Sequence, residues 1–413
     1  MRAIIGCLAL WCAAPALSQE SAGAGLSDYL YEGRIAEGIV DMAERDDPEA
    51  RFALGVLTVL SGLEDLAQAL YRHGFSPERG IAVGPFFAMA QAEGAVREPE
   101  PLTYEAFRGY LGAFVDVLDE ARPILLDAEG DYATEIAPLR IRLDIDGNGE
   151  ATATESIGAF VDLAMGTGRR LDMGMGMAPD FSVPDAVFAF DMADAIWLAG
   201  YTQVLALQAD FLLAHDFERM FDAAFHRLFP GAGLSMERFD SDGSLFIDRD
   251  SDALVADAIA LIHTINWPVI DRERFARVQD RLADVISLSR RNWQAILAET
   301  DDHLEFVPSP SQSPVYDAMA VTKPMVEAWL ETLDVAERIV SGALLLPHWR
   351  YGTLGFYLDA YFSDAERTDF VLLFSGLDAL PFLKEGEIAD AESFAAANAV
   401  FGGSIWSYAF WFN

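Results

Sequence analysis

The sequence predicts a mainly α-helical, multi-helix globular protein with little β-structure. Long stretches carry apolar residues at three- and four-residue spacing, which is typical of helices that bury one face. Hydrophobic residues make up 52% of the chain and charged residues 23%, a composition typical of a folded protein rather than a disordered one. Segments of strict alternation are short, so strands are expected to contribute little.

The helical pattern divides the chain into segments separated by turn residues. Glycine at position 74 fits the left-handed residue that follows a helix end, and prolines 308, 310 and 314 mark a polar loop. Residues 140–143 alternate and are expected to form a short strand. Helices are expected over 26–43, 48–72, 104–118, 155–165, 185–229 (with a potential interruption near Gly200), 251–265, 272–299, 323–345 and 391–401.

The first 18 residues are typical of a cleavable signal peptide. Met1-Arg2 is a short basic start, residues 3–14 are apolar, and Ala16-Leu17-Ser18 fits a small-residue cleavage site. We therefore expect an exported protein, periplasmic or extracellular. Both cysteines, Cys7 and Cys12, lie in this segment, so the mature chain is expected to have neither disulfides nor thiol chemistry.

The remainder is expected to form two helical regions. Residues 19–170 make an N-terminal helical region, and residues 185–413 make a C-terminal one. Between them, residues 171–184 carry glycine, proline and spaced methionines, which is typical of a linker.

The charge of the chain limits its partners. The formal net charge is −38, from 66 acidic against 28 basic residues, so nucleic acid and anionic membrane surfaces are disfavoured. The residues after Glu392 carry no charge and approach membrane-spanning length, but glycine, serine and asparagine interrupt them. A buried C-terminal element rich in aromatic residues is expected there, and membrane insertion is not.

Residues 144–155 carry the most specific chemical signal. They read Asp-Ile-Asp-Gly-Asn-Gly-Glu-Ala-Thr-Ala-Thr-Glu, with oxygen-bearing side chains at alternating positions and Gly149 where a sharp turn excludes a Cβ. These twelve residues resemble the calcium loop of the EF-hand superfamily. The resemblance implies a Ca²⁺ ion held by side-chain oxygens, by the carbonyl of position 7 and by a bidentate glutamate. The implied ligands are Asp144, Asp146, Asn148, Glu150, Thr152 and Glu155.

The flanks of this loop leave two alternatives open. Ala151 and Ser156 stand where the family has apolar residues, and the entering segment looks extended rather than helical. A calcium loop of the same type on a different scaffold fits these departures. A polar turn before a helix capped by Thr152 and Glu155 explains part of the pattern, but not the strict alternation of acidic residues.

A second acidic stretch, residues 240–252, starts like a calcium loop and then departs from it. Leu245 replaces the turn glycine and Ser251 replaces the closing glutamate. Asp248, Asp250 and Asp252 are better explained as the start of the next helix, where the helix dipole favours anions. An irregular second metal site is the alternative.

Two further groups could hold a transition metal. One helical face is expected to carry four side chains at a spacing that could ligate a transition metal; the four are His215, Glu218, Asp222 and His226. An ordinary amphipathic helix with a solvated polar face accounts for all four and is the preferred explanation. Met173, Met175 and Met177 offer soft thioethers of the kind that select Cu(I), without a nearby histidine.

One segment has the composition of a ligand pocket. Residues 347–351 combine an imidazole, a guanidinium and two aromatic rings, although a packed loop with Arg350 stacked on an aromatic ring explains them equally well. No hydrolase or phosphate-binding signature occurs elsewhere. We therefore favour an exported acidic calcium-binding protein with a structural ion and a non-enzymatic binding or envelope-associated role. The alternatives are a cell-envelope hydrolase using acidic residues with His348–Tyr351, and copper handling.

Overall fold

The computed structural model describes residues 22–76, 98–159, 186–237, 244 and 246–413. It confirms a mainly α-helical fold with a few short strands. The expected signal peptide and linker, and the methionines at 173, 175 and 177, lie outside the described residues.

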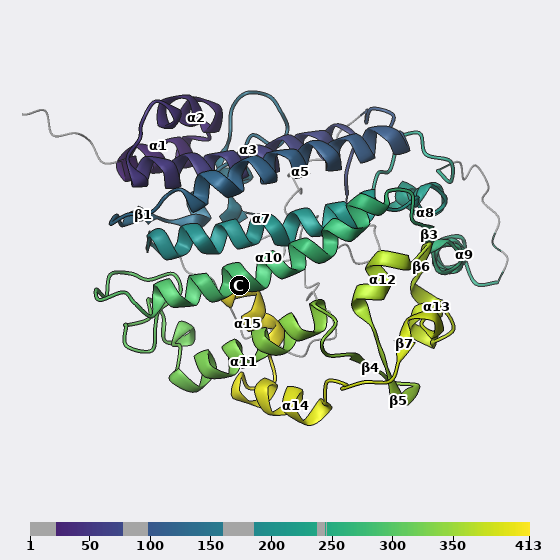
Figure 1. The fold of residues 1–413 in the computed structure, drawn as a ribbon. Helices are drawn as coiled ribbons and strands as arrows, with labels where there is room; N and C mark the ends of the chain where they lie inside the picture. Colours follow the sequence, from purple (N-terminus) through teal and green to yellow (C-terminus); the bar gives the residue numbers. More distant parts are fainter. Residues whose placement is uncertain (1–21, 77–97, 160–185, 238–243, 245) are drawn as a thin grey trace, which may run out of the picture.

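Four long helices lie side by side and form the body of the molecule (Figure 1). They are α3 (Pro48–Arg72), α5 (Tyr104–Leu126), α7 (Met192–Leu213) and α10 (Arg272–Ile296). Each begins at a residue whose side chain accepts a hydrogen bond from a backbone amide of the first turn; these caps are Asp47, Thr103, Asp191 and Asp271.

The first two helices pack on one end of α3. They are α1 (Ala22–Glu32) and α2 (Ile35–Ala43), so the single helix expected over 26–43 is wrong. The chain turns at Gly33, whose φ of +69° is a conformation that favours glycine. The expected helix 48–72 is confirmed at both ends, whereas α5 extends eight residues beyond the expected 118.

The expected helix over 185–229 is also wrong. The chain first forms β2 (Phe188–Phe190), then α7, and after a break α8 (Glu218–Ala224) with a 3₁₀ turn, η4 (Phe225–Arg227). Gly200 does not interrupt α7, which is continuous from Met192 to Leu213. The break falls at residues 214–217, whose backbone bonds to the segment after α9: the amides of Ile270 and Asp271 donate to the Ala214 carbonyl.

A buried charge network joins α5, α7 and α10. Arg281 donates to Asp210 at 2.7 Å, to Asp119 at 2.7 and 2.8 Å, and to Gln203 at 2.8 Å. Arg274 also bonds Asp210, whose side chain is completely buried. A buried charge needs such partners, so this network fixes how the three helices pack.

The C-terminal part packs below α10 in the view of Figure 1. It contains α11 (Lys323–Val340), α12 (Leu358–Asp364), α13 (Phe370–Ser375), α14 (Ala391–Val400) and α15 (Ile405–Phe412). Phe412 is fully buried and its carbonyl accepts a hydrogen bond from the Trp293 ring at 3.0 Å. The expected buried C-terminal element is therefore present at its end, although Trp406 and Phe410 are more than half exposed.

Three small antiparallel sheets connect these helices. β1 (Thr134–Ile136) pairs with β2, with Thr134 opposite Phe190, and β3 (Asn266–Pro268) pairs with β6 (Arg367–Asp369). The third sheet has the order β4-β5-β7, formed by Leu346–His348, Tyr351–Phe356 and Leu383–Lys384.

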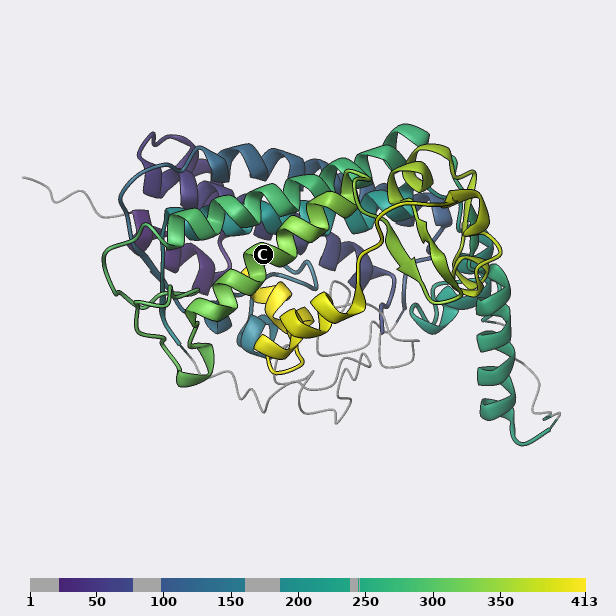
Figure 2. The same ribbon diagram turned by 60° about the horizontal axis from the view of Figure 1, so that its bottom comes forward.

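Helix α9 (Arg249–Thr264) projects away from the body, as Figure 2 shows. It begins at Asp248, whose carboxylate accepts the Ser251 amide at 2.9 Å, and Asp250 and Asp252 lie in its first turn. The interpretation of these aspartates as a helix start is confirmed.

One apolar core extends from Leu26 to Trp267 and includes residues of α3, α5 and α7. Two described helices, α3 and α7, are long and apolar enough to cross a membrane by length and composition. At least half of each apolar window is buried within the protein, which is also expected of core helices.

Candidate metal centre

The loop at residues 144–155 is closed at its base by pairing of its two flanks. Arg142 and Ser156 form an antiparallel bridge, the Leu143 amide donates to the Glu155 carbonyl at 3.2 Å, and the Ile157 amide donates to the Ile141 carbonyl at 2.9 Å. The entering segment is a 3₁₀ turn, η2 (Pro138–Arg140), followed by this bridge. The short strand expected over 140–143 is thus reduced to one bridged residue.

The exiting segment differs from the expected helix over 155–165 at its start. Glu155 ends a 3₁₀ turn, η3 (Ala153–Glu155), and helical residues begin only at Ile157; the structure describes them up to Ala159. Thr152 and Glu155 form the expected capping box. The described loop therefore follows an extended segment and ends in a 3₁₀ turn.

Alternating burial orients the acidic side chains of the loop. Leu143 and Ile145 are buried in the core, with 4% and 0% of their surface exposed. Successive side chains of an extended segment point to opposite sides, so Asp144 and Asp146 are directed away from that core. The sequence pattern apolar-acidic-apolar-acidic is what produces this arrangement.

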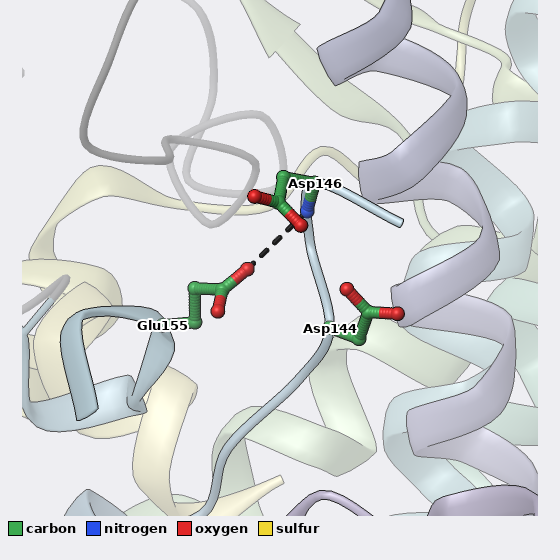
Figure 3. Close-up of side chains that lie close together, drawn as sticks. All are labelled: Asp144, Asp146 and Glu155. Atoms are coloured by element: carbon green, nitrogen blue, oxygen red, sulfur yellow. Dashed lines mark hydrogen bonds between the residues drawn. The ribbon is translucent and has the colours of Figure 1, made fainter. Parts of the chain in front are cut away.

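Three carboxylates of the loop converge (Figure 3). Asp144, Asp146 and Glu155 each offer an oxygen within 4.8 Å of the others, and Glu155 is only 5% exposed. No arginine, lysine or histidine among the described residues forms an ion pair with them. Two ionised carboxylates at this separation repel by about 3 kcal/mol at an effective dielectric constant of about 20. The cluster therefore attracts a cation.

Backbone amides hold the two aspartates in place. The Asn148 amide donates to Asp144 at 3.1 Å and to Asp146 at 3.0 Å, and the Gly149 amide donates to the second oxygen of Asp144 at 2.9 Å. Gly149 has a φ of +89°, which explains the need for glycine at this position. Each carboxylate oxygen keeps a further lone pair, so these bonds are compatible with metal coordination.

Glu155 joins the two ends of the loop. One of its oxygens accepts the amides of Ile145 at 3.0 Å and Asp146 at 3.3 Å, the second of which Figure 3 marks. Its other oxygen accepts the amide and the hydroxyl of Thr152, both at 2.8 Å. Both oxygens of this side chain are therefore directed into the loop.

The other implied ligands border the cluster. The Asn148 side-chain oxygen accepts the Glu150 amide at 2.8 Å, and its amide group donates to Asp146 at 2.9 Å. The Thr152 hydroxyl lies against Glu155, whereas the Glu150 residue is exposed. The structure brings Asp144, Asp146 and Glu155 into one group and keeps the remaining oxygens on the same short loop.

Two residues of α3 that the sequence did not indicate form hydrogen bonds to the backbone of the loop. Glu64 accepts the Asp144 amide at 2.8 Å, and Gln68 donates to the Asp144 carbonyl at 2.7 Å. Burial raises the pKa of Glu64 to about 7, helped by the charges of Asp144, Asp65 and Glu155 and opposed by the hydrogen bond from the Asp144 amide. Their four-residue spacing puts both on one helical face, but nothing local in the sequence indicates which segment that face contacts.

A second group of carboxylates lies where α7 begins. The Asp191 carboxylate caps α7 by accepting the amides of Ala193 and Asp194, and the Asp194 carboxylate accepts the Asp191 amide at 3.0 Å. Burial and the neighbouring Asp191 charge raise the pKa of Glu299 to about 8, and burial raises that of Glu305 to about 7. Burial also raises the pKa of Asp194 well above its ordinary value. This group is spread over distant segments, so no motif predicts it.

The polar face predicted to carry His215, Glu218, Asp222 and His226 does not form, because α7 ends at Leu213 and α8 begins at Glu218. His215 is fully buried, and its ring bonds the Phe211 carbonyl at 2.6 Å and Thr368 at 2.8 Å. His226 lies instead 3.2 Å from Asp257 of α9. These side chains do not converge on one site.

The segment 347–351 forms the turn between β4 and β5 and packs on α13. His348, Trp349 and Tyr351 bond the carbonyls of residues 373, 374 and 376 at 3.1, 2.7 and 3.2 Å. The Arg350 guanidinium lies 4.6 Å from the centre of the Trp349 ring. These contacts are those of a packed hairpin with a stacked arginine. Of the residues 240–252, positions 240–243 and 245 lie outside the described residues.

No protein-family model, curated protein or solved structure matches this chain. The class of protein is therefore defined by the fold and by the loop alone: a mainly α-helical protein with a cluster of three carboxylates on a short closed loop.

Proposed function

We propose that this chain is an exported, acidic calcium-binding protein with a structural ion at residues 144–155 and a non-enzymatic binding or envelope-associated role. The observation that carries the proposal is the convergence of Asp144, Asp146 and Glu155 without a basic partner among the described residues. Hard carboxylate, amide and carbonyl oxygens in this number suit Ca²⁺, and the absence of sulfur or imidazole in the loop argues against softer metals.

In the proposed site, Asp144, Asp146 and Asn148 each supply a side-chain oxygen. Glu155 supplies two, in exchange for some of the hydrogen bonds that its oxygens accept from Ile145, Asp146 and Thr152. The Glu150 carbonyl and Thr152, directly or through water, complete the ligands. The ion would neutralise the repulsion between the carboxylates, and it would fix the loop against α3, to which Glu64 and Gln68 already attach it. If calcium binds only the folded state, a concentration one hundred times Kd raises the free energy of unfolding by about 2.7 kcal/mol.

The pattern of residues 1–18, which is typical of a signal peptide, supports the exported part of the proposal. Extracellular calcium modules bind with Kd values of about 10⁻⁴ to 10⁻³ M, which external calcium would fill. The net charge of −38 suits the same setting, since cations there screen the repulsion between acidic side chains.

Calorimetric titration of calcium into the mature protein tests the proposal. We expect one ion per chain for the wild type and at least tenfold weaker binding for Glu155→Gln. The matched control is Glu150→Gln, which removes one charge from the same loop but leaves the proposed carbonyl ligand. We expect this control to bind within about threefold of the wild type. Equal affinities for Glu155→Gln and the control would overturn the ligand set.

A further inference from the structure

Among the residues that the structure describes, helix α9 packs against α8, and its buried side faces that contact. On that side Asp257 is 1% exposed, accepts a hydrogen bond from Arg227 at 2.5 Å and lies 3.2 Å from His226. These two partners belong to the 3₁₀ turn η4, which continues from α8. The buried charge pair holds α9 in the projecting position of Figure 2.

The outer side of α9 is an apolar stripe, formed by Leu254, Val255, Ile259 and Ile262. Between 52% and 56% of the surface of each is exposed. At about 100° per residue these side chains fall in one arc about 140° wide, centred well away from Asp257. An amphipathic helix normally buries such an arc, so the stripe has the pattern of a contact surface.

The stripe is approximately symmetric about Ala258. Leu254 and Ile262 stand four residues away on either side, and Val255 and the half-buried Leu261 stand three residues away on either side, whereas Ile259 has the buried Asp257 as its counterpart. A two-fold axis at Ala258 would place Leu254 against Ile262 of an antiparallel helix, and Val255 against Leu261. The small side chain at the crossing point lets the two helices approach closely.

The charges at the helix ends favour the same arrangement. The first turn holds Asp250 and Asp252, and the last turn holds His263. Antiparallel pairing brings the acidic end of one helix to the end that carries histidine in the other, and it opposes the two helix dipoles. A membrane surface fits less well, because helices that lie on membranes carry lysine and arginine along the polar face.

The apolar surface continues beyond both ends of α9. Phe246 and Ile247 precede it and are 84% and 72% exposed. At its other end the Phe370 amide of α13 donates to the Ile265 carbonyl at 3.2 Å, and Phe374 of α13 is 73% exposed. In an antiparallel pair the tip of one helix reaches the base of the other. This extension matters because α9 alone, about 24 Å long, offers well under the roughly 800 Å² per partner of a standard interface.

We propose that α9 is a self-association surface, through which two copies of this chain pair antiparallel about a two-fold axis near Ala258. Because both copies are strongly acidic, the pair forms more readily when salt screens their repulsion. The association is independent of the loop at 144–155.

Sedimentation velocity of the mature protein, at about 1 to 200 μM in EDTA, tests this proposal. We expect a concentration-dependent dimer whose fraction rises between 0.1 and 1 M NaCl. Ile259→Glu should raise the dimer Kd at least tenfold. Leu297→Glu is the control, because Leu297 is equally exposed, at 50%, and lies after α10. A wild type that stays monomeric throughout, or equal dimerisation of both variants, would overturn the proposal.

A cysteine variant keeps the test independent of folding effects. The described residues contain no cysteine, so Ala258→Cys introduces a single thiol at the expected axis. Mild oxidation should link two copies through residue 258, since an axis there brings the two Cα atoms within disulfide range. Leu297→Cys should give much less linked dimer. Equal linking at both positions, or flotation of monomer with phosphatidylcholine vesicles that Ile259→Glu abolishes, would contradict self-pairing.

Discussion

At the scale of single residues, the loop at 144–155 shows how neighbouring positions divide two tasks. Leu143 and Ile145 anchor the backbone in the core, and the alternate positions, Asp144 and Asp146, are thereby presented together. This arrangement follows from the sequence, because alternating apolar and acidic residues in an extended segment point to opposite sides. The contribution of Glu64 could not be predicted, since it depends on which turn of α3 contacts a loop that lies 80 residues later in the sequence.

The carboxylates at the start of α7 predict a pH dependence of stability. The pKa of Glu299 is raised to about 8, chiefly by burial and by Asp191, from an ordinary value of 4.5. The folded state therefore holds this proton more tightly than the unfolded state does. Stability should fall as the pH rises through the interval from about 4.5 to 8.

Urea unfolding at pH 5 and at pH 8.5 measures this effect. Glu299→Gln should gain about 1 kcal/mol relative to the wild type at pH 8.5, a value reduced for solvent screening, and little at pH 5. Glu385→Gln, a change at an exposed position, should show no such difference. A wild-type stability that rises over the same interval, together with no gain from Glu299→Gln, would contradict the assignment.

At the scale of elements, the sequence predicted helix ends correctly where a capping side chain or a following glycine determines them. The helix over 48–72 begins after Asp47 and was predicted at both ends. The break after α7 was not predicted, because residues 214–217 have no strong breaker. Their backbone groups bond instead to β3 and to the segment that follows it, as when the Asp216 amide donates to the carbonyl of Pro268, the last residue of β3, at 2.9 Å. Tertiary pairing of this kind has no local sequence signal.

The charge network between α7 and α10 predicts a large loss of stability when it is broken. Asp210→Ala leaves Arg281 and Arg274 without their buried acidic partner, which should cost about 3 to 5 kcal/mol. Asp334→Ala is the matched control, because its pair with Arg290 is exposed and should be worth less than about 1 kcal/mol. Denaturant unfolding of both variants provides the measurement, and similar losses would contradict a structural role for the network.

At the scale of the whole molecule, composition and periodicity were sufficient to predict a mainly helical, acidic protein. They could not predict how α5, α7 and α10 assemble, because that packing depends on contacts such as the one between Arg281 and Asp119, which are 162 residues apart. The proposed role of calcium also belongs to this scale. The loop attaches to α3 and its entering flank attaches to α1, where the Arg142 amide donates to the Leu30 carbonyl at 2.9 Å. An ion in the loop would therefore stabilise the N-terminal helices together.

A crystal structure of the mature protein grown in millimolar calcium chloride tests the central claim most directly. We predict one ion, with oxygens of Asp144, Asp146, Asn148 and Glu155 and the Glu150 carbonyl at about 2.3 to 2.6 Å. A loop that holds only ordered water in millimolar calcium, with the three carboxylates turned away from one another, would contradict the claim.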